Sequence, residues 1–244
     1  MTYNPNLKWL TPFFTVIAIL TAPLYSTEGT ETLKVTSSSF PWKKEIVTTV
    51  FWIGQGCTSI SDTTNAQSAW DAEWTQNYGG SDDPTKRSGF LPKKFAATLN
   101  PFYVALPFND VKYPDLAKKF IPWYKNPSEK NRWISQCKGK WIQIRNKNGK
   151  VAYGQWQDVG PIRTDNAKYV FGLDVSPAIQ DFLGLNGLDK TDWRFVEDFE
   201  VPPGPWLTYG EQAVLFSVIK KEELELAKDF EAPRKSIERK KKDS

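Results

Sequence analysis

The sequence predicts a mainly β protein: a small barrel or sandwich with one short helix and two large loop insertions. Three observations lead to this expectation. Short runs rich in β-branched and aromatic residues recur, turn residues separate them, and one segment has both helix-start and helix-stop signals. The strands are expected at 45–53, 102–106, 141–145, 151–157 and 193–196, and residues 206–219 offer one more.

The N-terminal half holds two of these strands and both insertions. The first strand reads EIVTTVFWI and ends at a Gly-Gln-Gly turn. Residues 58–98 are polar and rich in turn residues, which predicts the first insertion. If 67–76 forms a short helix, Trp70 and Trp74 share one of its faces. After the strand FYVAL, the polar and proline-punctuated segment 109–136 predicts the second insertion.

The C-terminal half begins with a predicted hairpin. The segments WIQIR at 141–145 and VAYGQWQ at 151–157 are joined by the turn sequence Asn-Lys-Asn-Gly. A short helix is expected through about Leu183, because Ser176 is a natural N-cap and Pro177 suits the first helical position. Glycines end this helix, and the strand WRFV follows it.

Composition divides the chain into four parts. Residues 1–26 read as a signal peptide, because a basic residue precedes the short apolar run FFTVIAILTA; an uncleaved anchor is the alternative. Residues 27–40 form a linker, and 41–200 form the barrel domain. Residues 201–244 form a C-terminal extension that ends in a charged tail. The expected location is secreted or periplasmic, with no stable membrane span after signal removal.

The net charge of +4 belongs to the tail. From Arg234 onward there are six basic and two acidic residues, so the rest of the chain is neutral. Such a tail is typical of a solvated, disordered segment. No basic binding face is indicated, and no nucleic-acid partner is expected.

The sequence has no histidine, which excludes Ser-His-Asp triads, Cys-His pairs and every metal site that uses histidine. Acid–base chemistry must therefore use carboxylates, lysine or tyrosine. Cys57 and Cys137 lack the spacing of a metal site; in an oxidising compartment they form one disulfide, and otherwise they are separate thiols. The pair Asp82-Asp83 lacks the spacing of a calcium loop. No metal and no cofactor are expected.

Tryptophan is abundant, with 11 residues, and aromatic residues make up 14% of the chain. Core packing explains part of this content, and sugar-binding surfaces are the other common cause. Trp70, Trp74 and Tyr78 are the best candidates for a platform that stacks on sugars, because they lie in a polar insertion. The alternative is that these rings pin the insertion to the barrel.

Several motifs resemble one family of barrels. The segments are QDVGP at 157–161, GLDVSP at 172–177 and WRFV at 193–196, with VALPF at 104–108 and TTVFW at 48–52 upstream. Their order is similar to that in expansins and in rare lipoprotein A, over about 100 residues in pieces. The resemblance implies a six-stranded double-psi β-barrel whose surface groove grips polysaccharide.

The resemblance also implies candidate site residues. Asp158 matches the acid of the glycan groove, and Asp110 is a possible second acid; the alternative is that Asp158 caps its own turn. Asp174 either borders the groove or bonds to the barrel backbone. Tyr103, where rare lipoprotein A has a histidine, is expected to line the groove or pack in the core. Trp156, beside Asp158, is a further substrate-binding candidate.

Three functions follow from these expectations. The first is an expansin-like protein that binds cell-wall polysaccharide without hydrolysis. The second is a lytic transglycosylase or glycosidase that acts on peptidoglycan with Asp158 as general acid and base; a hydrolase would need two carboxylates at a suitable separation. The third is a non-catalytic exported scaffold. In the first two cases the partner is cell-wall polysaccharide or peptidoglycan.

Overall fold

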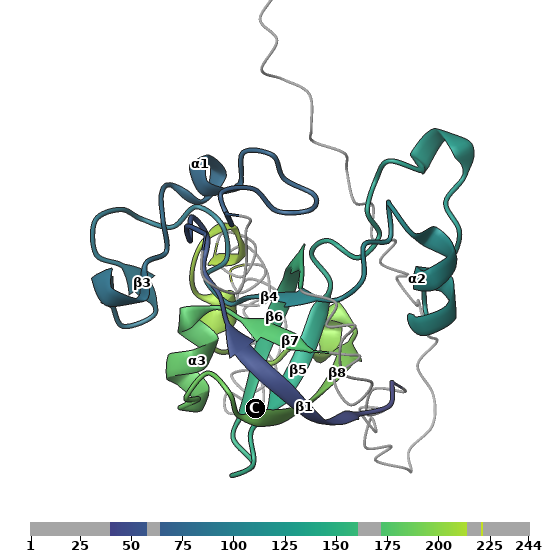
Figure 1. Cartoon of the computed structure of the whole chain (residues 1–244). Coiled ribbons are helices and arrows are strands. Elements are labelled where there is room, and N and C mark those ends of the chain that lie inside the picture. The colour runs from purple at the N-terminus through teal and green to yellow at the C-terminus, as the bar shows by residue number, and fades with distance from the viewer. Residues whose placement is uncertain (1–39, 58–63, 161–171, 214–220, 222–244) are drawn as a thin grey trace, which may run out of the picture. The chain divides into compact units, whose positions relative to one another are not determined.

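The computed structural model describes residues 40–57, 64–160, 172–213 and 221, and within them the protein is mainly β. Six strands close into a barrel in the order β1-β7-β4-β6-β5-β8 (Figure 1). They are β1 (Lys43–Val50), β4 (Tyr103–Leu106), β5 (Trp141–Arg145), β6 (Val151–Val159), β7 (Leu173–Val175) and β8 (Lys190–Val196). The pairs β1–β7 and β4–β6 are parallel and the others antiparallel. The mainly β prediction is confirmed, in its barrel form.

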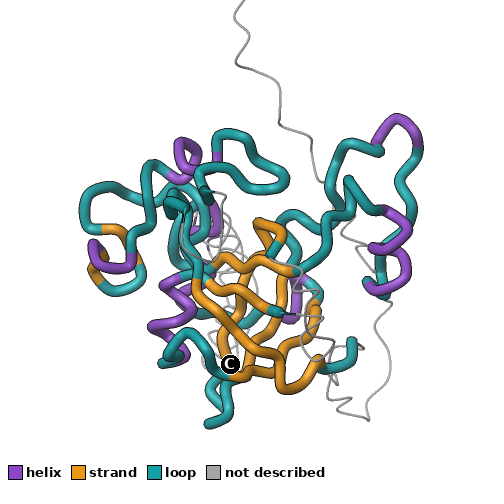
Figure 2. Tube along the Cα trace, in the orientation of Figure 1, coloured by secondary structure: helices purple, strands orange, loops and turns teal. Residues whose placement is uncertain are grey.

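Helices and a small second sheet lie outside the barrel strands (Figure 2). The helices are α1 (Trp74–Tyr78), α2 (Pro114–Phe120) and α3 (Pro177–Leu183), and the small sheet pairs β2 (Arg87–Ser88) with β3 (Leu91–Pro92). Short 3-10 turns occupy Pro84–Lys86, Glu129–Asn131, Asp198–Glu200 and Pro205–Leu207. The two predicted insertions thus hold α1 with the small sheet, and α2. None of the described helices is long and apolar enough to cross a membrane.

The hairpin of β5 and β6 forms as the alternating sequence predicts. Ile142 and Ile144 are fully buried, whereas the intervening Gln143 is only half-buried. The Arg194 side chain of β8 donates to the Gln143 amide oxygen at 2.6 Å. Period-two alternation therefore sends aliphatic groups into the barrel and hydrogen-bonding groups along its outside.

Gly154, at the middle of β6, leaves room inside the barrel for neighbouring side chains. A Cβ atom at this position would lie 2.6 Å from Val104 Cγ1 and 2.9 Å from Ile179 Cδ1. Both distances are below van der Waals contact, so any side chain here would force the side chains of Val104 and Ile179 to move. Glycine thus allows α3 to pack closely against the barrel wall.

The helix α3 confirms the cap prediction in detail. The Ser176 hydroxyl accepts the Ile179 N–H at 3.3 Å, and Pro177 occupies the first turn. Gly184 ends the helix in the left-handed conformation, with φ of 68°. Local capping chemistry alone specifies both ends of this helix.

The described residues form two apolar clusters. The larger includes the inward-facing barrel residues Val104, Ile142 and Trp193, and it extends to Ala117 and Ile121 of the second insertion. The smaller lies outside it, where the β4 residues Tyr103 and Ala105 pack against the first insertion; its members are Phe51, Ile53, Trp74, Tyr78, Ala97, Tyr103 and Ala105. The first insertion therefore has a core of its own that is shared with the outer face of β4.

Some predictions fail or lie outside the described residues. Residues 173–175, where the sequence predicts no strand, form β7. The optional strand at 206–219 is wrong for 206–213, which begin in a 3-10 turn. The signal peptide, nearly all of the linker and the charged tail lie outside the described residues.

The predicted disulfide does not form. Cys57 is exposed and Cys137 is buried, and no bond joins them. Burial, with the neighbouring Asp110, raises the pKa of the Cys137 thiol well above its usual range. The alternative expectation, two separate thiols, describes the structure.

Candidate functional site

Two carboxylates lie in one row across three neighbouring barrel strands. Ala105 of β4 is in register with Asp158 of β6 on one side and with Asp174 of β7 on the other. Residues in register on adjacent strands point to the same face, and Ala105 packs in the cluster outside the barrel. Asp158 and Asp174 therefore flank Ala105 on the outer face.

A β-bulge turns Asp158 to this outer face. Val104 pairs with Trp156 and Ala105 pairs with Asp158, so Gln157 is an extra residue in β6. Trp156 packs in the barrel core, and regular alternation would point Asp158 inward as well. A bulge re-aims the following side chain. Gln157 keeps the regular alternation and lies on the outside beside Gln155, where their side chains share a hydrogen bond of 2.9 Å.

The environment of Asp158 is both buried and hydrogen-bonded. Its Oδ1 atom accepts the Ala69 N–H at 2.8 Å and the Val159 N–H at 2.7 Å, and the residue is 8% exposed. Burial raises its pKa to about 6 and nearby Asp174 acts in the same direction, although the two N–H donors oppose the rise. A carboxyl group with this pKa can give or take a proton close to neutral pH.

Asp174 is fixed by contacts from two directions. The Thr49 hydroxyl of β1 donates to its Oδ1 atom. At Gly160 a Cβ atom would lie 3.2 Å from Asp174 Oδ2, so the backbone after β6 packs closely against this carboxylate. The Gly160 N–H also donates to Leu106 O at 2.9 Å. These contacts fit the structural reading of Asp174, and its place in the row fits the groove reading.

Segment 64–72 of the first insertion covers Asp158. Its Ala69 N–H bonds to Asp158, and the Trp70 ring meets the Trp156 ring edge-on with centroids 5.6 Å apart. Asp71 also lies 3.6 Å from the Lys138 ammonium of the second insertion. Of the three predicted platform residues, only Trp70 belongs to this segment; it packs on the inward-facing Trp156 and is half-buried.

The other platform residues do not form a surface. Trp74 and Tyr78 are fully buried, and both rings pack edge-on against Tyr103. Trp156 is also fully buried, and its indole N–H donates to the Asp158 carbonyl at 2.8 Å. As placed, these three rings cannot contact a polysaccharide. The pinning alternative describes Trp74 and Tyr78.

Tyr103 belongs to a buried polar cluster rather than to a groove. Its hydroxyl donates to Asp82 Oδ2 at 2.9 Å and accepts the Ile53 N–H at 3.1 Å. Arg87 forms an ion pair with Asp82 in the same cluster. Burial raises the pKa of Asp82 to about 6, with Arg87 opposing the rise. The cluster ties the first insertion to β4.

Asp110 makes its hydrogen bonds within the second insertion. Its carboxylate accepts the Ser135 hydroxyl at 2.8 Å and the Gln136 N–H at 2.7 Å, and its carbonyl accepts the Tyr124 hydroxyl at 3.2 Å. These bonds close the second insertion on itself. The structure therefore gives Asp110 a structural role and supplies Asp174, not Asp110, as the acid nearest in register to Asp158.

The sequence did not identify Gln155, Gln157 or Thr49 as site residues. The alternation of VAYGQWQ is the signal that both glutamines share a face, although it does not say which face is outside. Among the described residues, no group of three or more Cys, Asp or Glu side chains could hold a metal ion.

No model of a known protein family matches the chain, and no curated protein matches it.

Proposed function

We propose that this chain is an exported double-psi β-barrel protein that binds cell-wall polysaccharide along the row formed by Asp158 and Asp174. The main observation in its favour is the bulge that sets Asp158 on the outer face that also holds Asp174, Gln155 and Gln157. All four residues are buried in this structure. Carboxylates and amides in a row offer both acceptors and donors to sugar hydroxyls. The closed six-stranded barrel with two parallel pairs supports the double-psi assignment.

Binding along this row requires that segment 64–72 move. Ala69 donates its N–H to Asp158, so the cover competes with a sugar hydroxyl for the same carboxylate oxygen. Displacing the segment would also uncover the Trp70 ring, whose indole nitrogen is buried without a hydrogen-bond partner among the described residues. A freed tryptophan ring beside polar groups is a suitable surface for stacking on a pyranose.

A second function is favoured by the raised pKa of Asp158. A carboxyl group that keeps its proton up to about pH 6 can protonate a glycosidic oxygen and then accept a proton from the sugar's own hydroxyl. Asp158 alone would suffice for this lytic transglycosylase reaction. The binding protein remains the first proposal, because the hydrogen bonds of the Asp158 carboxylate are both to backbone N–H groups.

Incubation with purified insoluble cell-wall polysaccharide and with purified peptidoglycan sacculi tests both functions. The binding proposal expects the protein to sediment with one of these, and Gln155→Ala with Gln157→Ala or Trp70→Ala to weaken sedimentation. The transglycosylase proposal expects soluble fragments that disappear with Asp158→Asn. Asp115→Asn, which removes an exposed carboxylate on α2, is the matched control.

The outcomes separate the three functions. Sedimentation without released fragments supports binding alone, and fragments that depend on Asp158 support the enzyme. A protein that neither sediments nor releases fragments contradicts both proposals, and the non-catalytic scaffold is then the remaining function. Binding that survives the glutamine and Trp70 variants unchanged would place the glycan elsewhere on the molecule.

A further inference from the structure

The second insertion, between β4 and β5, presents large apolar side chains to solvent. Trp133 is 72% exposed and Ile134 is 62% exposed. Tyr113, Leu116 and Phe120 are exposed as well. Contiguous exposed apolar groups mark interaction sites, whereas single ones need no explanation.

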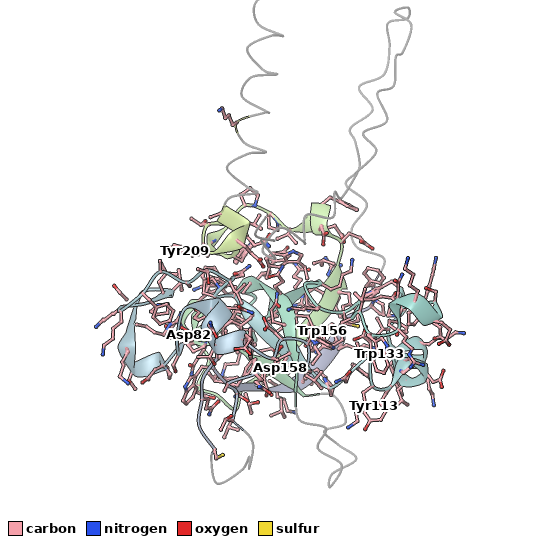
Figure 3. The ribbon with its side chains drawn as sticks, turned by 90° about the horizontal axis from the view of Figure 1, so that it is seen from above. Asp82, Tyr113, Trp133, Trp156, Asp158 and Tyr209 are labelled. Atoms are coloured by element: carbon pink, nitrogen blue, oxygen red, sulfur yellow. The ribbon has the colours of Figure 1, made fainter. Side chains whose placement is uncertain are left out.

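The positions of these five residues indicate one surface. Leu116 and Phe120 are four residues apart in α2, so they share a face of that helix, and Tyr113 is its N-cap residue, three positions before Leu116. Figure 3 shows Trp133 and Tyr113 on the same side of the molecule, where the second insertion lies. Tyr113, Leu116, Phe120, Trp133 and Ile134 are called the α2 patch below.

The insertion holds the α2 patch in place. Asp110 bonds to Ser135 and Gln136, which directly follow the patch residues Trp133 and Ile134. On the other side, Ala117 and Ile121 are buried in the main core and anchor α2. The apolar side chains are therefore presented by a braced segment.

Cations surround the α2 patch. Residues 109–136 contain six basic and three acidic residues, and all six basic side chains are exposed. One of the acids, Asp110, is buried and hydrogen-bonded, which leaves Asp115 and Glu129 on the surface. Three cations lie over patch rings. Arg132 is 4.4 Å from the centroid of the Trp133 ring. Lys112 is 5.4 Å from the centroid of the Tyr113 ring, and Lys119 is 5.4 Å from that of the Phe120 ring.

This chemistry favours an anionic lipid surface over a sugar or a nucleic acid. Stacking on a pyranose or a base needs open ring faces, and here cations lie over three of the rings. Leu116 and Ile134 have no flat face at all. Both aliphatic and aromatic groups can bury at the boundary between head groups and acyl chains, while neighbouring lysines and arginines meet anionic head groups.

We infer that the α2 patch docks the protein on the surface of an anionic lipid bilayer, with Trp133 and Ile134 inserted and the surrounding cations on the head groups. The contact is peripheral, and no part of the α2 patch crosses the bilayer. It is independent of the row at Asp158, which belongs to other strands and to the first insertion. A protein held in this way would keep its barrel close to a membrane while the row remains available to other ligands.

Vesicle sedimentation of the full chain tests the inference. Vesicles of phosphatidylcholine are compared with vesicles that also contain phosphatidylglycerol, at low and at high salt. Trp133→Ser with Ile134→Ser should weaken partition into the anionic vesicles by about tenfold or more, because two large apolar groups lose their burial. Lys118→Glu with Lys119→Glu should weaken it by a similar factor. The matched control, Leu188→Ser with Phe199→Ser, removes equally exposed apolar side chains elsewhere.

The expected result is binding to anionic vesicles that falls with salt, is lost in both patch variants and is kept in the control. Equal binding by the patch variants overturns the inference, since another segment then holds the membrane. Equal binding to neutral vesicles overturns it too. So does a dimer, seen by analytical ultracentrifugation, that Trp133→Ser dissociates. Circular dichroism of the patch variants is a check that their barrel is intact.

Discussion

Replacing Asp158 with asparagine should stabilise the folded protein at neutral pH. The folded state holds the Asp158 proton with a pKa of about 6, against 3.8 for an ordinary aspartate. Between these values the unfolded chain releases the proton and the folded protein keeps it, so the stability of the wild type falls as pH rises through this window. Asparagine carries no charge, and the variant escapes this loss.

The gain in unfolding free energy follows from the difference between the two pKa values of Asp158. A rise from 3.8 to about 6 corresponds to about 3 kcal/mol of unfolding free energy once the pH exceeds both values. Asparagine also keeps the local contacts, because the Ala69 and Val159 N–H groups both bond to the single oxygen Oδ1. The variant should therefore gain up to about 3 kcal/mol at pH near 8 and much less near pH 4.

Urea unfolding followed by tryptophan fluorescence, at about pH 4 and about pH 8, measures this difference. Asp82, whose pKa is also raised to about 6, is present in both proteins, so the comparison isolates Asp158. Asp115→Asn makes the same change of charge on the exposed face of α2 and should not reproduce the gain. A variant that is no more stable than the wild type near pH 8 would refute the claim that the folded protein desolvates this carboxylate.

Three further outcomes are expected. Asp110→Ala should lower the free energy of unfolding in urea by roughly 2 to 5 kcal/mol, because the Ser135 hydroxyl and the Gln136 N–H lose their buried acceptor. An unchanged unfolding midpoint would contradict the structural role of Asp110. Gly154→Ala should cost about 1 to 3 kcal/mol, because its Cβ would lie 2.6 Å from Val104 Cγ1, and Val104→Ala in the same chain should recover part of the loss. A thiol reagent should modify Cys57 in the native protein and reach Cys137 only after unfolding, and a reductant should leave the melting temperature unchanged; protection of both thiols until reduction would show a disulfide instead.

Elements whose causes are local could be predicted from the sequence. The helix α3 has its N-cap at Ser176 and its left-handed terminator at Gly184, and each acts within a few residues. The β5–β6 hairpin likewise follows from alternation and one turn. In contrast, β7 has three residues, and its partners β1 and β4 lie far away in the sequence. Its strand conformation depends on pairing that no local pattern reveals.

The site was only partly predictable for a related reason. Asp158 and Asp174 are identified by their motifs, but the bulge that turns Asp158 outward depends on its register with β4. The burial of Trp74 and Tyr78 depends on Tyr103, which lies in a strand beyond the insertion. A polar insertion predicts exposure of its aromatic residues only when it lacks a core, and this one shares a core with the barrel.

The predicted pH dependence of Asp158→Asn also bears on what the residue is for. A carboxylate that served only to cap a turn would be stabilised by its two N–H donors, and its pKa would fall. Here burial outweighs the donors and the pKa rises, so the charge destabilises the fold at neutral pH. An amide at this position would satisfy Ala69 and Val159 equally well. A measured gain in stability for Asp158→Asn would therefore argue that capping alone does not explain the acid, and would favour a functional role on the outer face of the barrel.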